Sequence, residues 1–175
     1  MQKNRTLRLL VTAALLAALT TVATMVIHIP TPSRGYIHPG DCIVILSGWL
    51  LGPVFGGAAA GLGSALADLM SGYAIYAPAT LLIKWGMAAA AWAVCHYFKK
   101  SSLPVCMMAA VLSEVIMMVG YALFAMVLLG SPHAFWLSLP ENLVQGVFGA
   151  AVSVLLYKTV LNRVPGLPGI GSHEK

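Results

Sequence analysis

Residues 9–29 read LLVTAALLAALTTVATMVIHI and contain no Asp, Glu, Lys or Arg. A helix needs about 20 mostly apolar residues to cross the hydrocarbon core of a bilayer, and this stretch is long enough. Lys3, Arg5 and Arg8 precede it, as in a secretory signal, but no clear A-x-A cleavage site closes it. The stretch therefore predicts a first transmembrane helix that is retained.

The rest of the chain has the same apolar character. Of its 175 residues, 59% are hydrophobic and only 9% are charged, whereas soluble domains carry roughly a quarter charged residues. Lipid must therefore be the main solvent, and the length leaves room for six spanning helices with short loops. A GxxxxGK[ST] phosphate loop is absent from the sequence, so the chain cannot supply ATP hydrolysis of that kind itself.

Proline, glycine and charge mark where the helices end. The second predicted helix is half the length needed to cross, so it either tilts and uses the turn at Gly52-Pro53 or re-enters the membrane. We expect one all-α membrane domain over residues 1–162 and a disordered, Pro/Gly-rich tail over 163–175. The six helices are predicted at about Leu7–His28, Asp41–Leu51, Val54–Ser71, Pro78–Phe98, Pro104–Leu129 and Leu137–Val160.

The basic residues predict the orientation. With six crossings, eight of the ten Lys and Arg residues fall on one side: before the first helix, between the fourth and fifth, or after the sixth. Cytoplasmic loops carry this excess, so both termini are expected in the cytoplasm. The same distribution explains the net charge of +5 without a nucleic-acid partner.

Ionisable and amide side chains gather in the outer half of the predicted bundle. A charge near the midplane costs about 2.5–3.5 kcal/mol, so these groups should face inward. One interpretation is structural, with Asp68 and Lys84 as an ion pair and Asp41 and Glu141 as helix caps. The other is a pocket for a small polar molecule, rimmed by aromatic residues. The candidate ligand-binding residues are Tyr36, His38, Asp41, Asp68, Tyr73, Tyr76, Lys84, Glu114, Asn142 and Gln145.

Two of these candidates stand apart from the rest. Glu114 lies deeper, near the middle of the fifth helix, where it could relay protons or join helices. His38 lies in the loop nearest Asp41.

Cys42, Cys95 and Cys106 form no CxxC pair, and no histidines have metal-ligand spacing, so neither a metal nor a cofactor is expected.

Small residues recur at four-residue steps on the first helix. Ala13, Ala14, Ala17 and Ala18 form two overlapping Ala-xxx-Ala pairs, a pattern that allows helices to approach closely in lipid. Such a surface serves either packing within the chain or binding of a partner.

Four further segments complete a resemblance to a known family. They are residues 35–41 (GYIHPGD), 63–73 (GSALADLMSGY), 77–84 (APATLLIK) and 140–145 (PENLVQ). With the Ala-xxx-Ala surface and in this order, they resemble the substrate-binding S components of energy-coupling factor (ECF) vitamin transporters. The resemblance covers Thr6 to about Val160 and is closest to the riboflavin-type or pyrimidine/B6-type subgroup.

The resemblance implies a six-helix fold in a prokaryotic plasma membrane and capture of a vitamin from outside. It implies docking through Ala13, Ala14, Ala17 and Ala18 onto a membrane scaffold with two ATPases, and a first loop, from Pro30 to Gly40, that covers the site. The subgroup often has Asn-Leu where this chain has His38-Pro39. We favour a B6 vitamer or a related pyridine or pyrimidine, with riboflavin as the alternative.

Two other classes of function are less well supported. A stand-alone secondary transporter needs a coupling-ion site, for which Glu114 is the deep candidate, and no inverted repeat is visible. An intramembrane enzyme needs a nucleophile and a base, but Ser64 and Ser113 have no histidine at a matching depth. We therefore expect no enzymatic activity.

Overall fold

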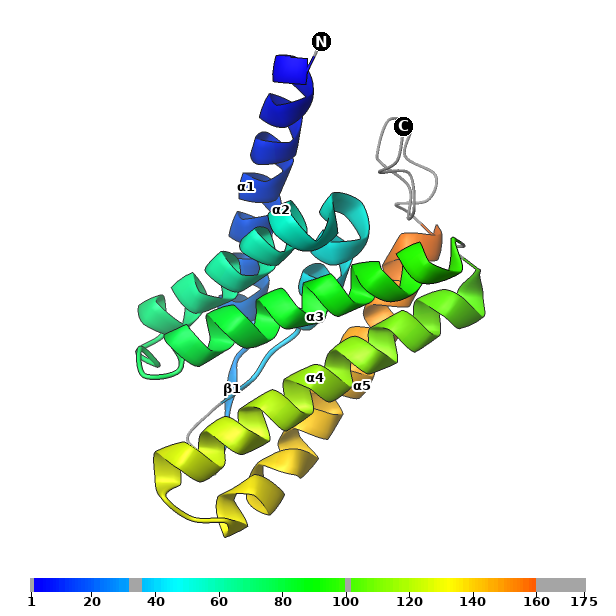
Figure 1. Ribbon diagram of the computed structural model, residues 1–175. Coiled ribbons are helices and arrows are strands. Elements are labelled where there is room, and N and C mark those ends of the chain that lie inside the picture. Colours follow the sequence, from blue (N-terminus) through cyan, green and yellow to red (C-terminus); the bar gives the residue numbers. More distant parts are fainter. Residues whose placement is uncertain (1, 32–35, 100–101, 160–175) are drawn as a thin grey trace.

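The computed structural model describes residues 2–31, 36–99 and 102–159 and is built almost entirely of helices (Figure 1). The predicted tail at 163–175 lies outside the described residues. Between the first two helices, Ile29 pairs with Ile37 and Pro30 with Tyr36 in a short antiparallel ribbon. The elements are α1 (Gln2–Val26), β1 (Ile29–Pro30), β2 (Tyr36–Ile37), α2 (Asp41–Met70), α3 (Ala77–Phe98), α4 (Leu103–Leu129) and α5 (His133–Thr159).

Five helices in the described part of the chain are long and apolar enough to cross a membrane, whereas the sequence predicts six. The difference lies in α2, in which the two segments expected as separate helices follow one another without a loop. Gly52 interrupts the helical geometry between them with φ 76° and ψ −173°, and Pro53 follows it. The predicted break at Gly52-Pro53 is therefore a kink, with arms at 41–51 and 53–70.

Close backbone contacts pack the two arms of α2 against each other and against α3. A Cβ added to Gly56 would lie 2.2 Å from the Ser47 carbonyl oxygen, and one added to Gly48 would lie 2.1 Å from the Ala88 carbonyl oxygen. Only glycine permits such an approach. Every residue of the first arm is buried, so this arm forms the centre of the molecule.

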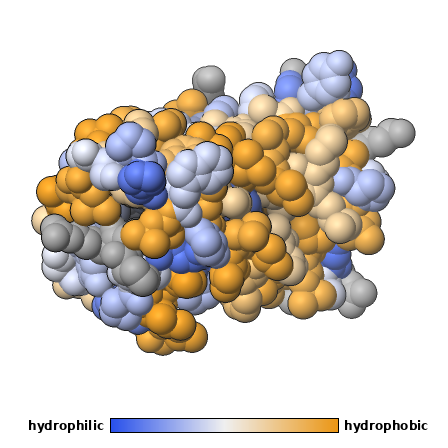
Figure 2. Space-filling view, turned by 90° about the horizontal axis from the view of Figure 1, so that it is seen from below, coloured by the Kyte–Doolittle hydropathy of each residue, from blue (hydrophilic) through white to orange (hydrophobic). Residues whose placement is uncertain are grey.

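The remaining helices pack around α2 to different extents. The helix α3 lies between α2 and α4, α4 and α5 form an antiparallel pair, and α1 packs mainly on α2 (Figure 1). Large apolar side chains face outward, such as Leu15 (65% exposed) and Val26 (73% exposed) on α1. Hydrophobic residues make up most of the surface in Figure 2. This is the surface of a protein that lies in lipid.

The connections fall at two ends of the bundle. The kink of α2, the end of α3, the start of α4 and the end of α5 lie toward the upper right of Figure 1, and α1 begins at the top. The ribbon and the connections at 71–76 and 130–132 lie toward the lower left. The polar residues singled out from the sequence lie near this second end.

Candidate ligand-binding site

An ion pair between two fully buried residues lies at the centre of the site. The Lys84 ammonium on α3 binds Asp41 Oδ1 at the start of α2, and both side chains are 0% exposed. Gln145 on α5 donates a hydrogen bond to Asp41 Oδ2 at 2.7 Å. A buried carboxylate requires such partners, because its desolvation otherwise costs several kcal/mol. The ion pair and Gln145 together therefore join three helices.

This arrangement corrects the ion pair that the sequence suggests. Asp68 does not pair with Lys84. Its Oδ1 accepts a hydrogen bond of 2.6 Å from the Tyr36 hydroxyl on β2 instead. The carboxylate of Asp41 is also not a simple helix cap, because it is bound by side chains from α3 and α5.

The loop before α2 is tied to the same centre. The backbone N–H of His38 donates to Gln145 Oε1 at 3.0 Å, and the Gly40 N–H donates to His38 Nδ1 at 3.1 Å. Burial lowers the pKa of His38 to about 4, so its ring is neutral at physiological pH and Nδ1 can accept that bond. Gln145 thus connects the loop to the buried ion pair.

Aromatic residues cover the outer side of the site. The Tyr36 ring lies 4.6 Å from that of Tyr73 and 4.9 Å from that of His28, centroid to centroid, and Tyr73 lies 6.3 Å from Tyr76. Burial and the carboxylate of Asp68 raise the pKa of Tyr36 above its ordinary value. Its hydroxyl therefore stays protonated and donates to Asp68.

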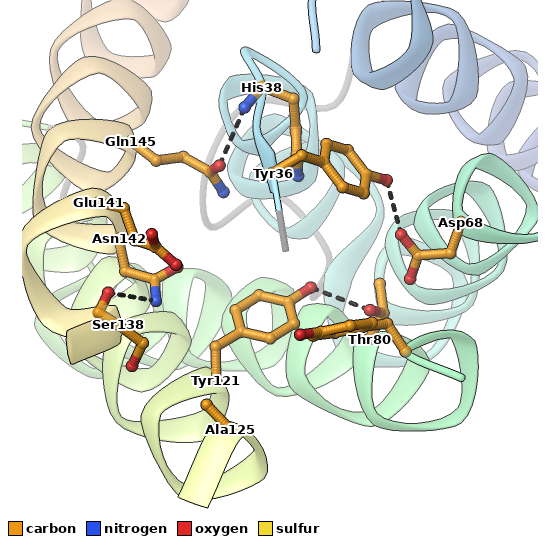
Figure 3. Close-up of a pocket in the computed structure, with 11 residues that line it drawn as sticks. Tyr36, His38, Asp68, Thr80, Tyr121, Ala125, Ser138, Glu141, Asn142 and Gln145 are labelled. Carbon is orange, nitrogen blue, oxygen red and sulfur yellow. Dashed lines mark hydrogen bonds between the residues drawn. The ribbon is translucent and has the colours of Figure 1, made fainter. Parts of the chain in front are cut away.

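These side chains enclose a small cavity (Figure 3). Its volume is about 30 Å³, enough for roughly two water molecules. The labelled side chains in Figure 3 converge on it from the ribbon and from α2, α3, α4 and α5. The lining residues are Tyr36, His38, Asp68, Tyr76, Thr80, Tyr121, Ala125, Ser138, Glu141, Asn142 and Gln145.

Four polar lining residues were not among the candidates drawn from the sequence: Thr80, Tyr121, Ser138 and Glu141. Glu141, expected to cap a helix, lies within α5. The Tyr121 hydroxyl donates to Thr80 Oγ1 at 3.0 Å, and the Tyr121 ring lies 5.2 Å from Lys84 Nζ. Thr80 precedes Lys84 by four residues, a spacing that places both on one helix face and could have indicated it. Ser138 accepts a hydrogen bond from Asn142 Nδ2 through its carbonyl oxygen at 2.9 Å. No sequence pattern distinguishes Tyr121 or Ser138 from other residues of their helices.

Two buried carboxylates keep oxygens with no hydrogen-bond partner among the described residues. They are Oδ2 of Asp68 and both carboxylate oxygens of Glu114. Glu114 does not line the cavity; it packs against Gly146 and Gly149 of α5, close to Asp41. Asp68 does line it. An acceptor at a cavity wall with no protein donor is suited to a ligand N–H or O–H group.

The four alanines of α1 separate into two pairs. Ala13 and Ala17 are half-buried, and a Cβ added to Gly63 of α2 would lie 2.5 Å from the Ala17 carbonyl oxygen. Ala14 and Ala18 are exposed. The first pair therefore lies toward α2, while the second is available to a partner.

Comparisons with known proteins agree with this architecture. A family model described as "ECF-type riboflavin transporter, S component" matches residues 4–162. A Pyrococcus woesei protein described as "Uncharacterized protein in gap 3'region" is 36% identical over 135 residues, which are 75% of this chain and 87% of that protein. The chain also resembles a solved structure described as "Structure and mechanism of the S component of a bacterial ECF transporter". The TM-score is 0.67 at 21% identity, over 89% of this chain and 96% of that one. At this identity the likeness shows the fold alone.

Proposed function

The chain belongs to the family of S components of ECF-type riboflavin transporters, and we propose that it captures a vitamin from outside the cell for such a transporter. The observation that carries the proposal is the polar cavity near one end of the bundle, lined by side chains of four helices and covered by the ribbon. In this role the protein binds and delivers the vitamin and catalyses no reaction.

Binding requires the loop between α1 and α2 to move. The cavity of about 30 Å³ is much smaller than a vitamin ring, and His38 and Tyr36 of this loop form part of its wall. Opening breaks the His38–Gln145 and Tyr36–Asp68 hydrogen bonds. Both acceptors then become available to a ligand, so the loop exchanges its own hydrogen bonds for those of the vitamin.

The favoured ligand is a B6 vitamer or a related pyridine or pyrimidine. A small ring requires less opening of the cavity than a larger vitamin does, and its N–H and O–H donors suit the unpartnered Oδ2 of Asp68. Tyr36, Tyr73 and Tyr76 provide aromatic surfaces on which such a ring can stack. Riboflavin is the second candidate, because the matching family model is described by that vitamin.

The partners are a transmembrane scaffold and two ATPases. Ala14 and Ala18 of α1 are exposed, and small residues at this spacing allow a helix of another subunit to approach closely. In the proposed topology the two arms of α2 each count as a crossing. The chain then crosses a prokaryotic plasma membrane six times, with both termini in the cytoplasm.

The test is to identify the bound ligand and the energy source that drives its uptake. Mass spectrometry of the detergent-extracted protein, followed by titration with pyridoxine, pyridoxal and riboflavin, should give tight binding of one of these compounds. Copurification with a scaffold and an ATPase pair is expected as well. Proton-driven uptake by the protein alone would contradict the proposal and favour a secondary transporter.

A further inference from the structure

A second hollow lies far from the polar cavity, between the start of α4 and the end of α5. It is a groove of about 480 Å³ lined by apolar side chains and, at one end, by Lys158. Its floor includes Ala110, which is 0% exposed, and its rim includes Met107 and Val147, which are 52% and 64% exposed. The groove opens toward the surface that faces lipid.

Small residues create the groove. Ala110 on α4 and Ala150 and Ala151 on α5 line it, and none of them extends beyond Cβ. The neighbouring Met107 and Leu155 are long and largely exposed. These alanines between longer side chains leave room for an unbranched hydrocarbon chain within the 480 Å³ of the groove.

The length of the groove matches one leaflet of a bilayer. Val147 and Lys158 lie about 11 residues apart on α5, which is roughly 16 Å along the helix axis. Half of a hydrocarbon core of about 30 Å is ~15 Å. A lipid tail lying in the groove would therefore end near the midplane when its headgroup is level with Lys158.

The charge at the end of the groove indicates which lipid fits. Lys158 is half-buried, with its ammonium 5.9 Å from the centroid of the Tyr157 ring. It lies at the end of the bundle where the positive-inside rule predicts the cytoplasm, and that leaflet contains the anionic lipids. A lysine at this level attracts a lipid phosphate, and an anionic headgroup strengthens the attraction.

We propose that this groove binds an anionic phospholipid of the cytoplasmic leaflet. One acyl chain lies between α4 and α5 along Ala110, Ala150 and Ala151, and the headgroup phosphate binds the Lys158 ammonium. The site is separate from the polar cavity, so it does not depend on which vitamin the protein binds.

The experiment uses delipidated full-length protein in detergent and native mass spectrometry. The probes are phosphatidylglycerol and phosphatidylcholine with identical acyl chains. We expect phosphatidylglycerol to bind about fivefold more tightly, since a lysine near the headgroups contributes roughly that factor. Lys158→Gln should abolish the preference, and Lys158→Arg should keep it. Ala151→Leu should weaken both lipids by filling the groove.

Matched variants elsewhere serve as controls. Lys99→Gln removes an exposed cation at the end of α3, and Ala93→Leu enlarges an exposed alanine on α3; neither should change lipid binding. Equal affinity for the two lipids, or a preference that persists in Lys158→Gln, overturns the proposal. Disulfide-linked dimers of Ala151→Cys that form in place of lipid binding would assign the groove to a second copy of the chain and overturn it too.

Discussion

At the scale of single residues, Lys84 and Asp41 neutralise each other where neither reaches water. Lys84→Met leaves the Asp41 charge buried without its cation, and we expect a loss of about 3–5 kcal/mol in the free energy of unfolding. Asp41→Asn combined with Lys84→Met should recover most of that loss, because no charge remains buried. Unfolding in detergent measures both. Equal instability of the single and double variants would contradict the pairing.

A substitution at Asn142 tests the cavity with less effect on the stability of the protein. Its side chain lines the cavity, and among the described residues its hydrogen bond runs to the Ser138 carbonyl oxygen one turn earlier. Asn142→Ala should weaken vitamin binding about tenfold, as expected for one hydrogen bond lost in a dry site, and leave the melting temperature unchanged.

The neighbouring Leu143→Ala, at a position 51% exposed on the lipid side, is the control for Asn142 and should bind normally. Wild-type affinity in Asn142→Ala would exclude this residue from the binding site. Gln145→Ala is less suitable, because Gln145 also holds Asp41 and the His38 backbone.

The sequence predicts which residues are polar and buried more reliably than it predicts their partners. Asp41 and Asp68 have similar expected depths, so depth alone could not select the one that binds Lys84. The choice depends on the approach of Gly48 to the Ala88 backbone, which draws the first arm of α2 against α3. Such a contact between distant segments has no local pattern. Tyr121 was missed for the same reason, whereas Thr80 did have a local signal in its four-residue spacing from Lys84.

At the scale of elements, Gly52 determines the shape of α2. Its φ of 76° and ψ of −173° lie in a region that is essentially restricted to glycine. A Cβ there would meet Trp92 only at ordinary distances near 3.6 Å, so the cost is backbone strain. Gly52→Ala should lower the free energy of unfolding by about 1–3 kcal/mol.

Gly86→Ala is the matched substitution within a regular helix. An added Cβ at Gly86 meets Ile116 at an ordinary 3.7 Å, and alanine favours the helix by up to ~1 kcal/mol. Thermal unfolding should therefore separate a destabilised Gly52→Ala from a Gly86→Ala variant that is unchanged or more stable. Equal melting temperatures would show that the kink is not strained by a side chain.

The effect of substituting an alanine of α1 should depend on whether that alanine lies toward α2 or is exposed. Ala14→Leu and Ala18→Leu add bulk at exposed positions, so we expect normal stability and vitamin binding but reduced copurification with the scaffold. Ala17→Leu should lower the melting temperature, because the Ala17 backbone contacts Gly63. Loss of vitamin binding in Ala14→Leu would instead indicate that this surface packs within the chain.

The bounds of α3 and α4 agree within one residue with those expected from proline, glycine and charge, because these residues act on the turn in which they lie. The helices α1 and α5 begin five and four residues earlier than expected, at Gln2 and His133. The ribbon at Ile29–Pro30 and Tyr36–Ile37 was not foreseen, since two residues per strand carry no periodicity. The continuity of α2 was also missed. A Gly-Pro step usually ends a helix, whereas here a second arm begins directly after Gly52, whose φ is 76°.

At the scale of the whole molecule, the positive-inside rule predicts which end faces the cytoplasm. In a variant whose three cysteines have been replaced, Ala74→Cys should react with an impermeant maleimide in intact cells, because the connection at 71–76 is expected outside. Ser102→Cys, at the start of α4, should react only after permeabilisation. The reverse pattern would invert the topology.

Asp41 and Lys84 lie 43 residues apart in the chain, and a ribosome adds about 5–20 residues per second. For roughly 2–9 s, therefore, the newly made Asp41 has no cation to meet, and carrying it toward the midplane costs ~2.5–3.5 kcal/mol. We therefore expect the first arm of α2 to settle in the bilayer only after α3 has been synthesised. On this expectation the order of insertion differs from the order of synthesis, and a substitution at Lys84 should appear in the cell first as failed insertion of residues 41–70.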